Sequence, residues 1–204
     1  AHCLPYFRKA ETYERGGDEY RGDNGPRHVS AGKFHSPLYQ AFVDAGVQAG
    51  YPNTPDMNGY QQEGFGIMDR TIKNGRRWSA ADAYLKPILR RSNLYLQTRS
   101  LTHKIIFDGM RATGVKFEKS GKMHAVFAAK SVILSGGTIN SPQLLLLSGI
   151  GPRRHLEDLE IPVVADIPGV GENLQDHLDY SMQIACRQPV SYYPATKPLG
   201  RLGV

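Results

Sequence analysis

The sequence predicts a mixed α/β fold, in which strands and helices share one chain. Short runs of β-branched and aromatic residues follow one another between residues 93 and 134, and this pattern is typical of strands. An apolar run at residues 132–134 then leads into Gly136-Gly137 and a helical pattern. Strands that precede a strand–glycine–helix unit indicate a protein that mixes both kinds of element.

The first third of the chain is predicted to hold one clear helix. Residues 5–11 are interpreted as the end of a helix, and residues 27–30 as a brief strand among glycine-rich turns. The clear helix begins after Ser36, a residue type that caps helices, with Pro37 at its first position, and it ends at Gly50. Its predicted apolar stripe is Leu38, Ala41, Phe42, Ala45 and Ala49.

The middle of the chain is predicted to change from loop to strands. Residues 51–66 are rich in Pro, Asn, Gly and Gln, which favours a long loop, and a short helix is expected at about residues 79–85. Ser120-Gly121-Lys122 suits a hairpin turn between the third and fourth strands. The predicted strands are residues 94–98, 104–107, 112–118, 124–128 and 131–134.

Two helices and a strand are predicted in the last third. A helix is expected to begin at Asn140 or Ser141, with Pro142 in its first turn, and to stop at Gly149. A shorter helix follows at residues 153–159, and residues 180–186 have the composition of a strand.

The composition excludes several classes of function. The 204 residues include 25 Lys and Arg against 19 Asp and Glu, a net charge of +6, but the positive residues are scattered and indicate no nucleic-acid-binding arm. No apolar run approaches the roughly 18 residues that span a bilayer. Cys3 and Cys186 give no disulfide framework, which favours a reducing compartment. The seven histidines have no metal-ligand spacing, so no metal site is predicted.

The two ends suggest a piece of a longer protein. The chain starts at Ala1 rather than at a methionine, and no closing element precedes Val204. The dinucleotide fingerprint GxGxxG does not occur in these residues, since the nearest string, at residues 169–174, lacks the third glycine.

The glycine turn at Gly136-Gly137 admits two interpretations. Glycines let the backbone approach a bulky ligand, and the N–H groups of the following helix favour anionic partners. A tight turn without a ligand explains the same local pattern, because glycine is common at such turns.

The longer string at residues 136–151 is more specific than its parts. With Ser141-Pro142 and Ser148-Gly149-Ile150-Gly151, it resembles the second signature of the glucose–methanol–choline (GMC) oxidoreductases. Residues 75–85 and 168–177 also resemble this family at its usual spacing. Its members are flavin-dependent alcohol oxidases and dehydrogenases, so the resemblance implies an FAD cofactor and a small alcohol substrate.

Within this family, three blocks resemble the choline-oxidising members of animal mitochondria: residues 56–66 (DMNGYQQEGFG), 77–81 (RWSAA) and 133–145 (ILSGGTINSPQLL). The resemblance implies oxidation of choline to betaine aldehyde, a quinone-type electron acceptor, a location at the mitochondrial inner membrane and membrane association of the full-length protein. A family member that acts on a sugar, sterol or aliphatic alcohol is the nearest alternative. A truncated chain without catalytic activity is another.

The family architecture implies an FAD-binding, Rossmann-like domain interleaved with a substrate-binding domain. Residues 1–74 would then form a substrate-side segment, residues 75–178 the central part of the FAD-binding domain, and residues 179–204 the start of the substrate-domain sheet.

The resemblance also assigns four cofactor-binding residues. Thr102 matches the position whose backbone contacts the FAD adenine, and Ser135, Gly136 and Gly137 would lie beside the adenosine. The alternatives are an ordinary strand threonine and a plain turn. The catalytic histidine of the family lies outside these residues, so no catalytic residue is assigned, and we expect the isolated chain neither to hold FAD tightly nor to oxidise alcohols. Candidates for contact with a quaternary ammonium are Tyr60, Glu63 and Phe65.

Overall fold

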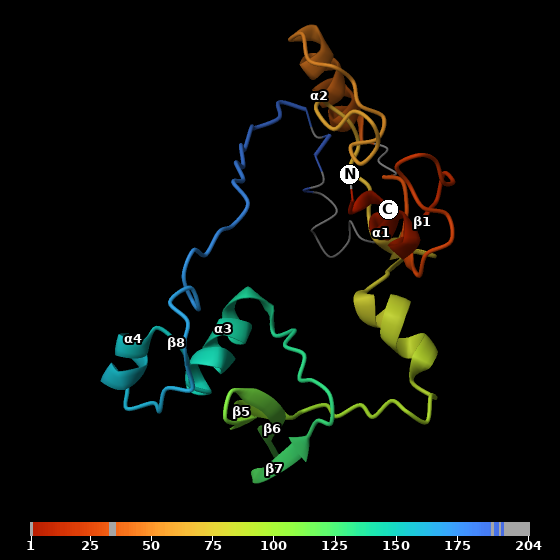
Figure 1. Cartoon of the computed structure of the whole chain (residues 1–204). Coiled ribbons are helices and arrows are strands. Elements are labelled where there is room, and N and C mark those ends of the chain that lie inside the picture. Colours follow the sequence, from red (N-terminus) through yellow and green to blue (C-terminus); the bar gives the residue numbers. More distant parts are fainter. Residues whose placement is uncertain (1, 33–35, 189, 192, 194–204) are drawn as a thin grey trace. The chain divides into compact units, whose positions relative to one another are not determined.

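The computed structural model describes residues 2–32, 36–188, 190–191 and 193 (Figure 1). The contacts divide the chain into two compact units: unit 1 comprises residues 1–95 and 182–204, and unit 2 comprises residues 96–181. The predicted division into domains at residues 75 and 179 stays a prediction.

Unit 1 begins with a helix that runs directly into a strand. Helix α1 (Leu4–Ala10) confirms the helix predicted near residues 5–11, and strand β1 (Glu11–Tyr13) follows it without a loop. Strand β2 (Arg27–Val29), also predicted, pairs with β1 in parallel. Tyr13 and Val29 are both buried, so the inner face of this pair forms part of the core of unit 1.

The predicted capped helix is present as α2 (Pro37–Gln48). The Ser36 hydroxyl accepts a hydrogen bond from the Leu38 N–H at 3.3 Å, which satisfies one of the free amides of the first turn. The buried positions of α2 are Val43 and Gly46 rather than the predicted stripe. Gly46 is required there because a Cβ would lie 2.3 Å from the ring of Phe65.

A short hairpin and a short helix complete unit 1. Strands β3 (Ile72–Lys73) and β4 (Arg76–Arg77) are antiparallel, and Asn74 and Gly75 between them both have positive φ, as a tight hairpin requires. The helix expected at residues 79–85 is present as η1 (Ala81–Leu85), and it continues into η2 (Lys86–Ile88).

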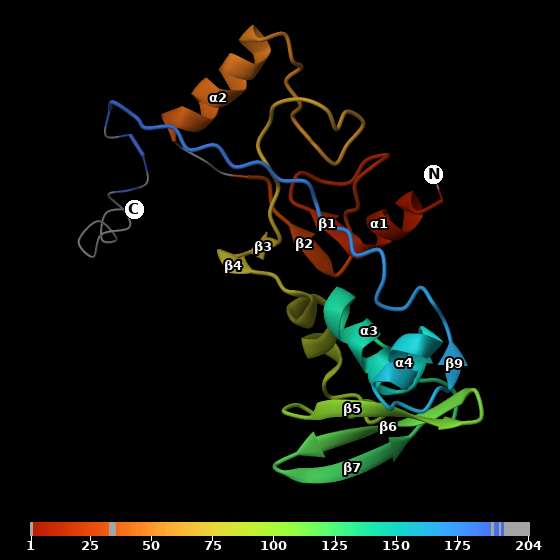
Figure 2. The same cartoon turned by 90° about the vertical axis from the view of Figure 1, so that its left-hand side faces the viewer.

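Unit 2 is built on a three-stranded antiparallel sheet. Strands β5 (Leu101–Asp108), β6 (Arg111–Lys119) and β7 (Lys122–Phe127) follow one another in space as in sequence, as Figure 2 shows. The hairpin turn predicted between the last two is confirmed, with φ of 52° at Ser120 and 73° at Gly121.

Two helices and a second strand pair accompany the sheet. Helix α3 (Gly137–Leu147) lies against β5 (Figures 1 and 2). Strands β8 (Ile150–Gly151) and β9 (Ala165–Asp166) pair in parallel, and helix α4 (Arg153–Asp158) belongs to the segment of chain that connects them. The α4 residue Leu156 is completely buried.

The structure corrects several predicted elements. The strands expected at residues 94–98, 131–134 and 180–186 are not formed, because none of these segments pairs with another strand of the described residues. The third helix begins at Gly137, about one turn earlier than Asn140 or Ser141, so Pro142 lies inside it. A positive φ of 85° at Gly137 lets the chain enter the helix at this point.

The predicted mixed α/β class is confirmed by these helices and sheets. Among the residues that the structure describes, no helix is long and apolar enough to cross a membrane.

Candidate functional site

A cavity of about 650 Å³ in unit 2 is the candidate site. Three segments form it: the start of β5 with one residue of β6, the extended segment that leads into α3, and one face of α3 itself. Its lining residues are Ser100, Leu101, Thr102, Val115, Val132, Ile133, Leu134, Ser135, Gly136, Asn140, Ser141, Gln143, Leu144 and Leu147.

The structure brings three of the four predicted cofactor-binding residues to this cavity. Thr102, Ser135 and Gly136 line it, although they come from segments more than 30 residues apart in the sequence. Gly137 does not line the cavity. A Cβ built on it would meet no atom within 4 Å, so the space beside its Cα is open. Residues 132–134, which were expected to belong to a strand, also line the cavity, without forming one.

Strand β5 is irregular where it enters the cavity. Thr102 lies opposite Phe117 of β6, whereas Lys104 lies opposite the next residue, Lys116, so His103 is the extra residue of a β-bulge. The ring Nε2 of His103 lies 3.2 Å from a carboxylate oxygen of Glu118. Such bulges change the direction of neighbouring side chains, and this one immediately follows Thr102.

The hydroxyls of two serines form hydrogen bonds at the two ends of α3. At the start, the Ser141 hydroxyl accepts a hydrogen bond from the Gly136 N–H at 3.1 Å. At the other end, the buried Ser148 hydroxyl donates to the Leu144 carbonyl at 2.6 Å and accepts from the Ile105 N–H of β5 at 2.9 Å. The cavity wall formed by α3 is thus fixed to the wall formed by β5.

The cavity lining is electrically neutral. None of its 14 residues is Asp, Glu, Lys, Arg or His. Its apolar part is made of leucine, isoleucine and valine side chains, and its polar part of hydroxyls and amides. A neutral group with both apolar and polar parts fits such a lining, whereas a phosphate or an ammonium group would be left without a counter-charge.

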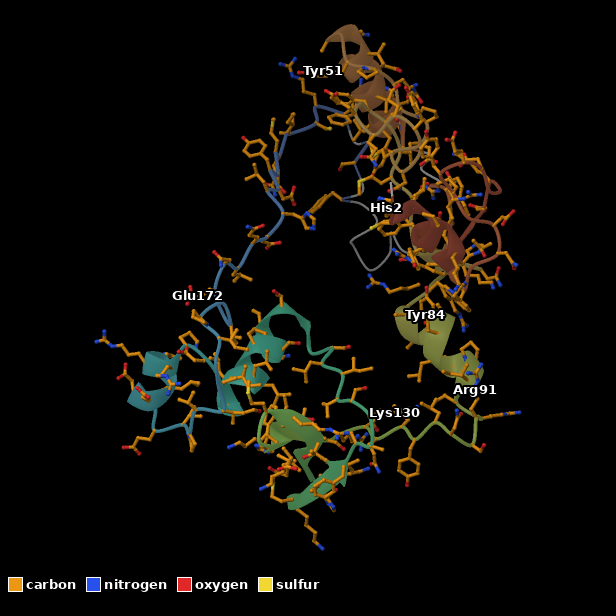
Figure 3. All side chains as sticks on the ribbon, viewed as in Figure 1. His2, Tyr51, Tyr84, Arg91, Lys130 and Glu172 are labelled. Carbon is orange, nitrogen blue, oxygen red and sulfur yellow. The ribbon has the colours of Figure 1, made fainter. Side chains whose placement is uncertain are left out.

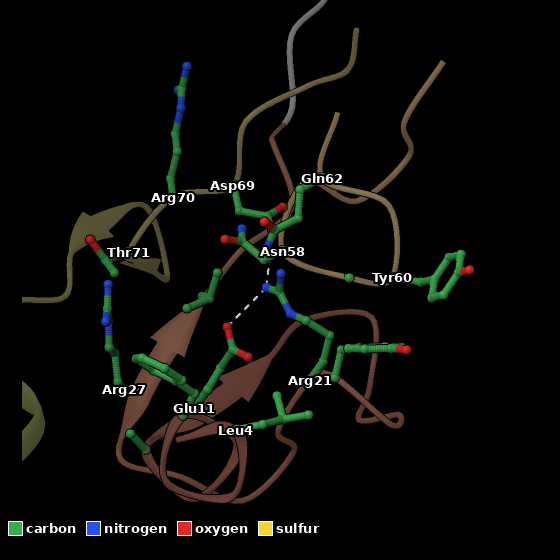
Figure 4. Close-up of a pocket in the computed structure, with 15 residues that line it drawn as sticks. Leu4, Glu11, Arg21, Arg27, Asn58, Tyr60, Gln62, Asp69, Arg70 and Thr71 are labelled. Carbon is green, nitrogen blue, oxygen red and sulfur yellow. Dashed lines mark hydrogen bonds and ion pairs between the residues drawn. The ribbon is translucent and has the colours of Figure 1, made fainter. Parts of the chain in front are cut away.

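A second cavity, of about 730 Å³, lies in unit 1 and has a charged lining (Figure 4). At its centre Arg21 is only 1% exposed, and its guanidinium lies 2.9 Å from Glu11, 2.9 Å from Asp56 and 3.0 Å from Asp69. The guanidinium carbon also lies 3.7 Å from the ring centre of Tyr13. Burial, with the nearby carboxylates of Asp69 and Asp56, raises the pKa of Tyr13.

This ion cluster joins separate parts of unit 1. Glu11 belongs to β1, Arg21 to the loop after it, and Asp56 and Asp69 to the stretch between α2 and β3. Because each of the three carboxylates is already engaged by the same guanidinium, the cluster acts first as a cross-link of the fold.

The candidates for quaternary-ammonium recognition are separated by the structure. Tyr60 lines the charged cavity and makes an edge contact with Tyr20, with ring centres 6.1 Å apart. Phe65 instead packs against Phe42 and Tyr51, and Glu63 lines neither of the two cavities described above. These three residues therefore do not form one pocket.

A third cavity, of about 620 Å³, lies beside α3. It is bounded by residues 169–175, a loop that includes Glu172 (Figure 3), and it shares Ser141 and Gln143 with the neutral cavity. In the described part of the chain no group of His, Cys, Asp and Glu could hold a metal ion.

Sequence reasoning did not assign Asn140 and Gln143 to the site, although both are polar residues of the neutral cavity. Their spacing of three residues, followed by Leu144 and Leu147, would have placed all four on one face of a helix. This pattern was not recognised because the helix was predicted to begin at Asn140 or Ser141. That prediction placed Asn140 at the first position of the helix rather than on one of its faces.

Comparison with known proteins identifies relatives of this chain. The family model of the GMC oxidoreductases matches residues 1–179. The mitochondrial choline dehydrogenase of Mus musculus is 55% identical over 99% of this chain, which corresponds to 34% of the mouse protein. The oxygen-dependent choline dehydrogenase of Pseudomonas putida KT2440 is 57% identical over 95% of this chain and 35% of the bacterial protein. The chain thus spans about a third of the length of these relatives.

Solved structures agree with this result. An FAD-dependent oxidoreductase from Chaetomium thermophilum matches with a TM-score of 0.78 and 32% sequence identity, over 85% of this chain and 32% of that one. The match supports the predicted kinship with FAD-binding folds.

Proposed function

Because the chain belongs to the GMC oxidoreductase family, we propose that it forms the central part of an FAD-dependent enzyme that oxidises choline to betaine aldehyde. The observation that carries this proposal is the neutral cavity, where Thr102, Ser135 and Gly136 meet. The sequence identity of 55–57% to choline dehydrogenases from an animal and a bacterium supports choline as the alcohol.

The residues of the cavity fit the adenosine half of FAD. The backbone of Thr102 would contact the adenine, and the lack of side chains at Gly136 and Gly137 would let the backbone approach the sugar. The apolar side chains of α3 and β5 would pack against the base. Bound FAD supplies the acceptor for the hydride that leaves the alcohol carbon.

The electron acceptor and the location are further parts of the proposal. The mouse relative is named a mitochondrial protein, which supports the proposal of a mitochondrial location. The quinone-type acceptor and the association of the full-length protein with the inner membrane are proposed from the family resemblance alone. The Pseudomonas relative is named oxygen-dependent, so molecular oxygen is the acceptor to compare in the same assay.

Flavin absorbance is the decisive measurement. The purified 204-residue chain and the longest natural polypeptide that contains it are each incubated with FAD and desalted. We expect flavin to remain on the longer polypeptide, to be bleached by choline without oxygen, and to leave the isolated chain. Bleaching by glucose but not by choline would favour the alternative, another alcohol or sugar oxidoreductase of the same family. No retained flavin on either protein would favour the non-catalytic alternative.

A further inference from the structure

The neutral cavity contains two side-chain amides with no hydrogen-bond partner among the described residues. Asn140 and Gln143 both lie on α3 and both line the cavity. The nearby hydroxyl of Ser141 is already engaged by the Gly136 N–H, and that of Ser100 donates to the Thr98 carbonyl at 3.3 Å. On the cavity wall formed by α3, the two amides are therefore the groups that offer a donor and an acceptor side by side.

The position of the amides follows from the geometry of the helix. Asn140 and Gln143 are three residues apart, so they lie on the same face, and Leu144 and Leu147 continue that face along the cavity. A flat group that packs on the two leucines would thus bring its polar edge within reach of the amides. Since the lining has no charged residue, this polar edge must itself be neutral.

We propose that Asn140 and Gln143 recognise the amino-bearing edge of an adenine base, and so select adenine nucleotides over other nucleotides. Adenine presents an amino donor next to a ring-nitrogen acceptor, and an amide matches this pair with two hydrogen bonds. The inference rests on the proposed function, in which the adenosine half of FAD occupies this cavity. It adds residues that read the identity of the base, a role separate from the backbone contact at Thr102.

The test compares two nucleotides that differ only at the amino group. AMP and purine riboside monophosphate, which lacks the 6-amino group, are titrated by calorimetry into the flavin-free form of the longest natural polypeptide that contains this chain. We expect the wild-type protein to prefer AMP by roughly tenfold or more, as one good amide–adenine pair provides. Asn140→Ala, Gln143→Ala and the double variant should progressively lose that preference while still binding both nucleotides.

The control variant is Thr138→Ala, since Thr138 lies on the same helix but does not line this cavity. It should keep the wild-type preference, and thermal unfolding should show that all the variants are folded. A double variant that retains the full preference for AMP would overturn the inference while leaving the cofactor site intact. Failure of the wild-type protein to bind either FAD or AMP would instead remove the cofactor site, and this inference with it.

Discussion

The hydroxyl of Ser148 accepts a hydrogen bond from the Ile105 N–H at 2.9 Å, in a region where both residues are buried. Ile105 is in the middle of β5, and Ser148 directly follows α3. The same hydroxyl donates to the Leu144 carbonyl, so it links the last turn of the helix to the strand. One buried side chain therefore fixes the two walls of the neutral cavity to each other.

Replacing Ser148 with alanine should loosen these two walls. The Ile105 N–H would be left buried without a partner, which costs about 1–3 kcal/mol of the free energy of unfolding. Hydrogen exchange at the Ile105 amide should become faster, and this can be measured directly by NMR. Ser131→Ala is the control, because Ser131 is exposed and should leave the exchange rate of Ile105 unchanged. Equal exchange in both variants would contradict the assigned role.

The Arg21 cluster predicts a larger effect in unit 1. Arg21→Met would leave three carboxylates close together without their shared cation, and removing one partner from a buried ion pair costs about 3–5 kcal/mol. Trp78 belongs to unit 1 and is the one tryptophan of the chain, so its fluorescence during urea unfolding reports this loss. Arg15→Met, at an exposed arginine, should change stability by no more than about 0.5 kcal/mol.

The glycine after α3 has a required conformation and no room for a side chain. Gly149 has a φ of 88°, and a Cβ on it would lie 2.3 Å from the Pro162 carbonyl oxygen. Gly149→Ala should therefore combine a left-handed alanine, about 1–2 kcal/mol, with overpacking, about 1–3 kcal/mol. Gly109→Ala separates the two costs, because Gly109 also has positive φ but faces open space. Urea titrations of the two variants that give equal losses would refute the contact with Pro162.

The sequence predicted those elements whose signals are local. Ser36 followed by Pro37 marked the start of α2, and Ser120-Gly121 marked the turn between β6 and β7. In both cases the residues themselves supply the cap or the positive φ, so no distant partner is needed. The turn at Asn74-Gly75 carries the same kind of signal, and the hairpin of β3 and β4 could have been predicted from it.

Elements that depend on distant partners were not predictable in this way. Residues 131–134 have the composition of a strand, but a strand forms only where another one pairs with it, and within the described residues none does. The parallel pair of β8 and β9 joins two-residue segments, too short to show a periodic pattern. For the candidate site, the resemblance supplied Thr102 and Gly136, whereas Asn140 and Gln143 became visible once the face of α3 was known.

The acid-side titration of Asp82 gives a further prediction about unit 1. The Lys86 ammonium next to this carboxylate is the main cause that lowers the pKa of Asp82 to about 2, and hydrogen bonds from the side chain and N–H of Ser79 lower it further. A carboxyl with a lowered pKa stabilises the folded state above its unfolded pKa of 3.8, and this contribution is lost as the pH falls through about 2.

Carbon-13 NMR of the Asp82 carboxyl group should therefore show a midpoint near pH 2 in the folded protein. In Lys86→Met the midpoint should move up towards the ordinary value, because the neighbouring positive charge is gone, while the hydrogen bonds from Ser79 keep it from reaching that value. Asp82→Asn should abolish the signal and remove the associated pH dependence of stability between about pH 4 and 2. A wild-type midpoint at the ordinary value of 3.8 would show that Lys86 and Ser79 do not stabilise the charged form of Asp82.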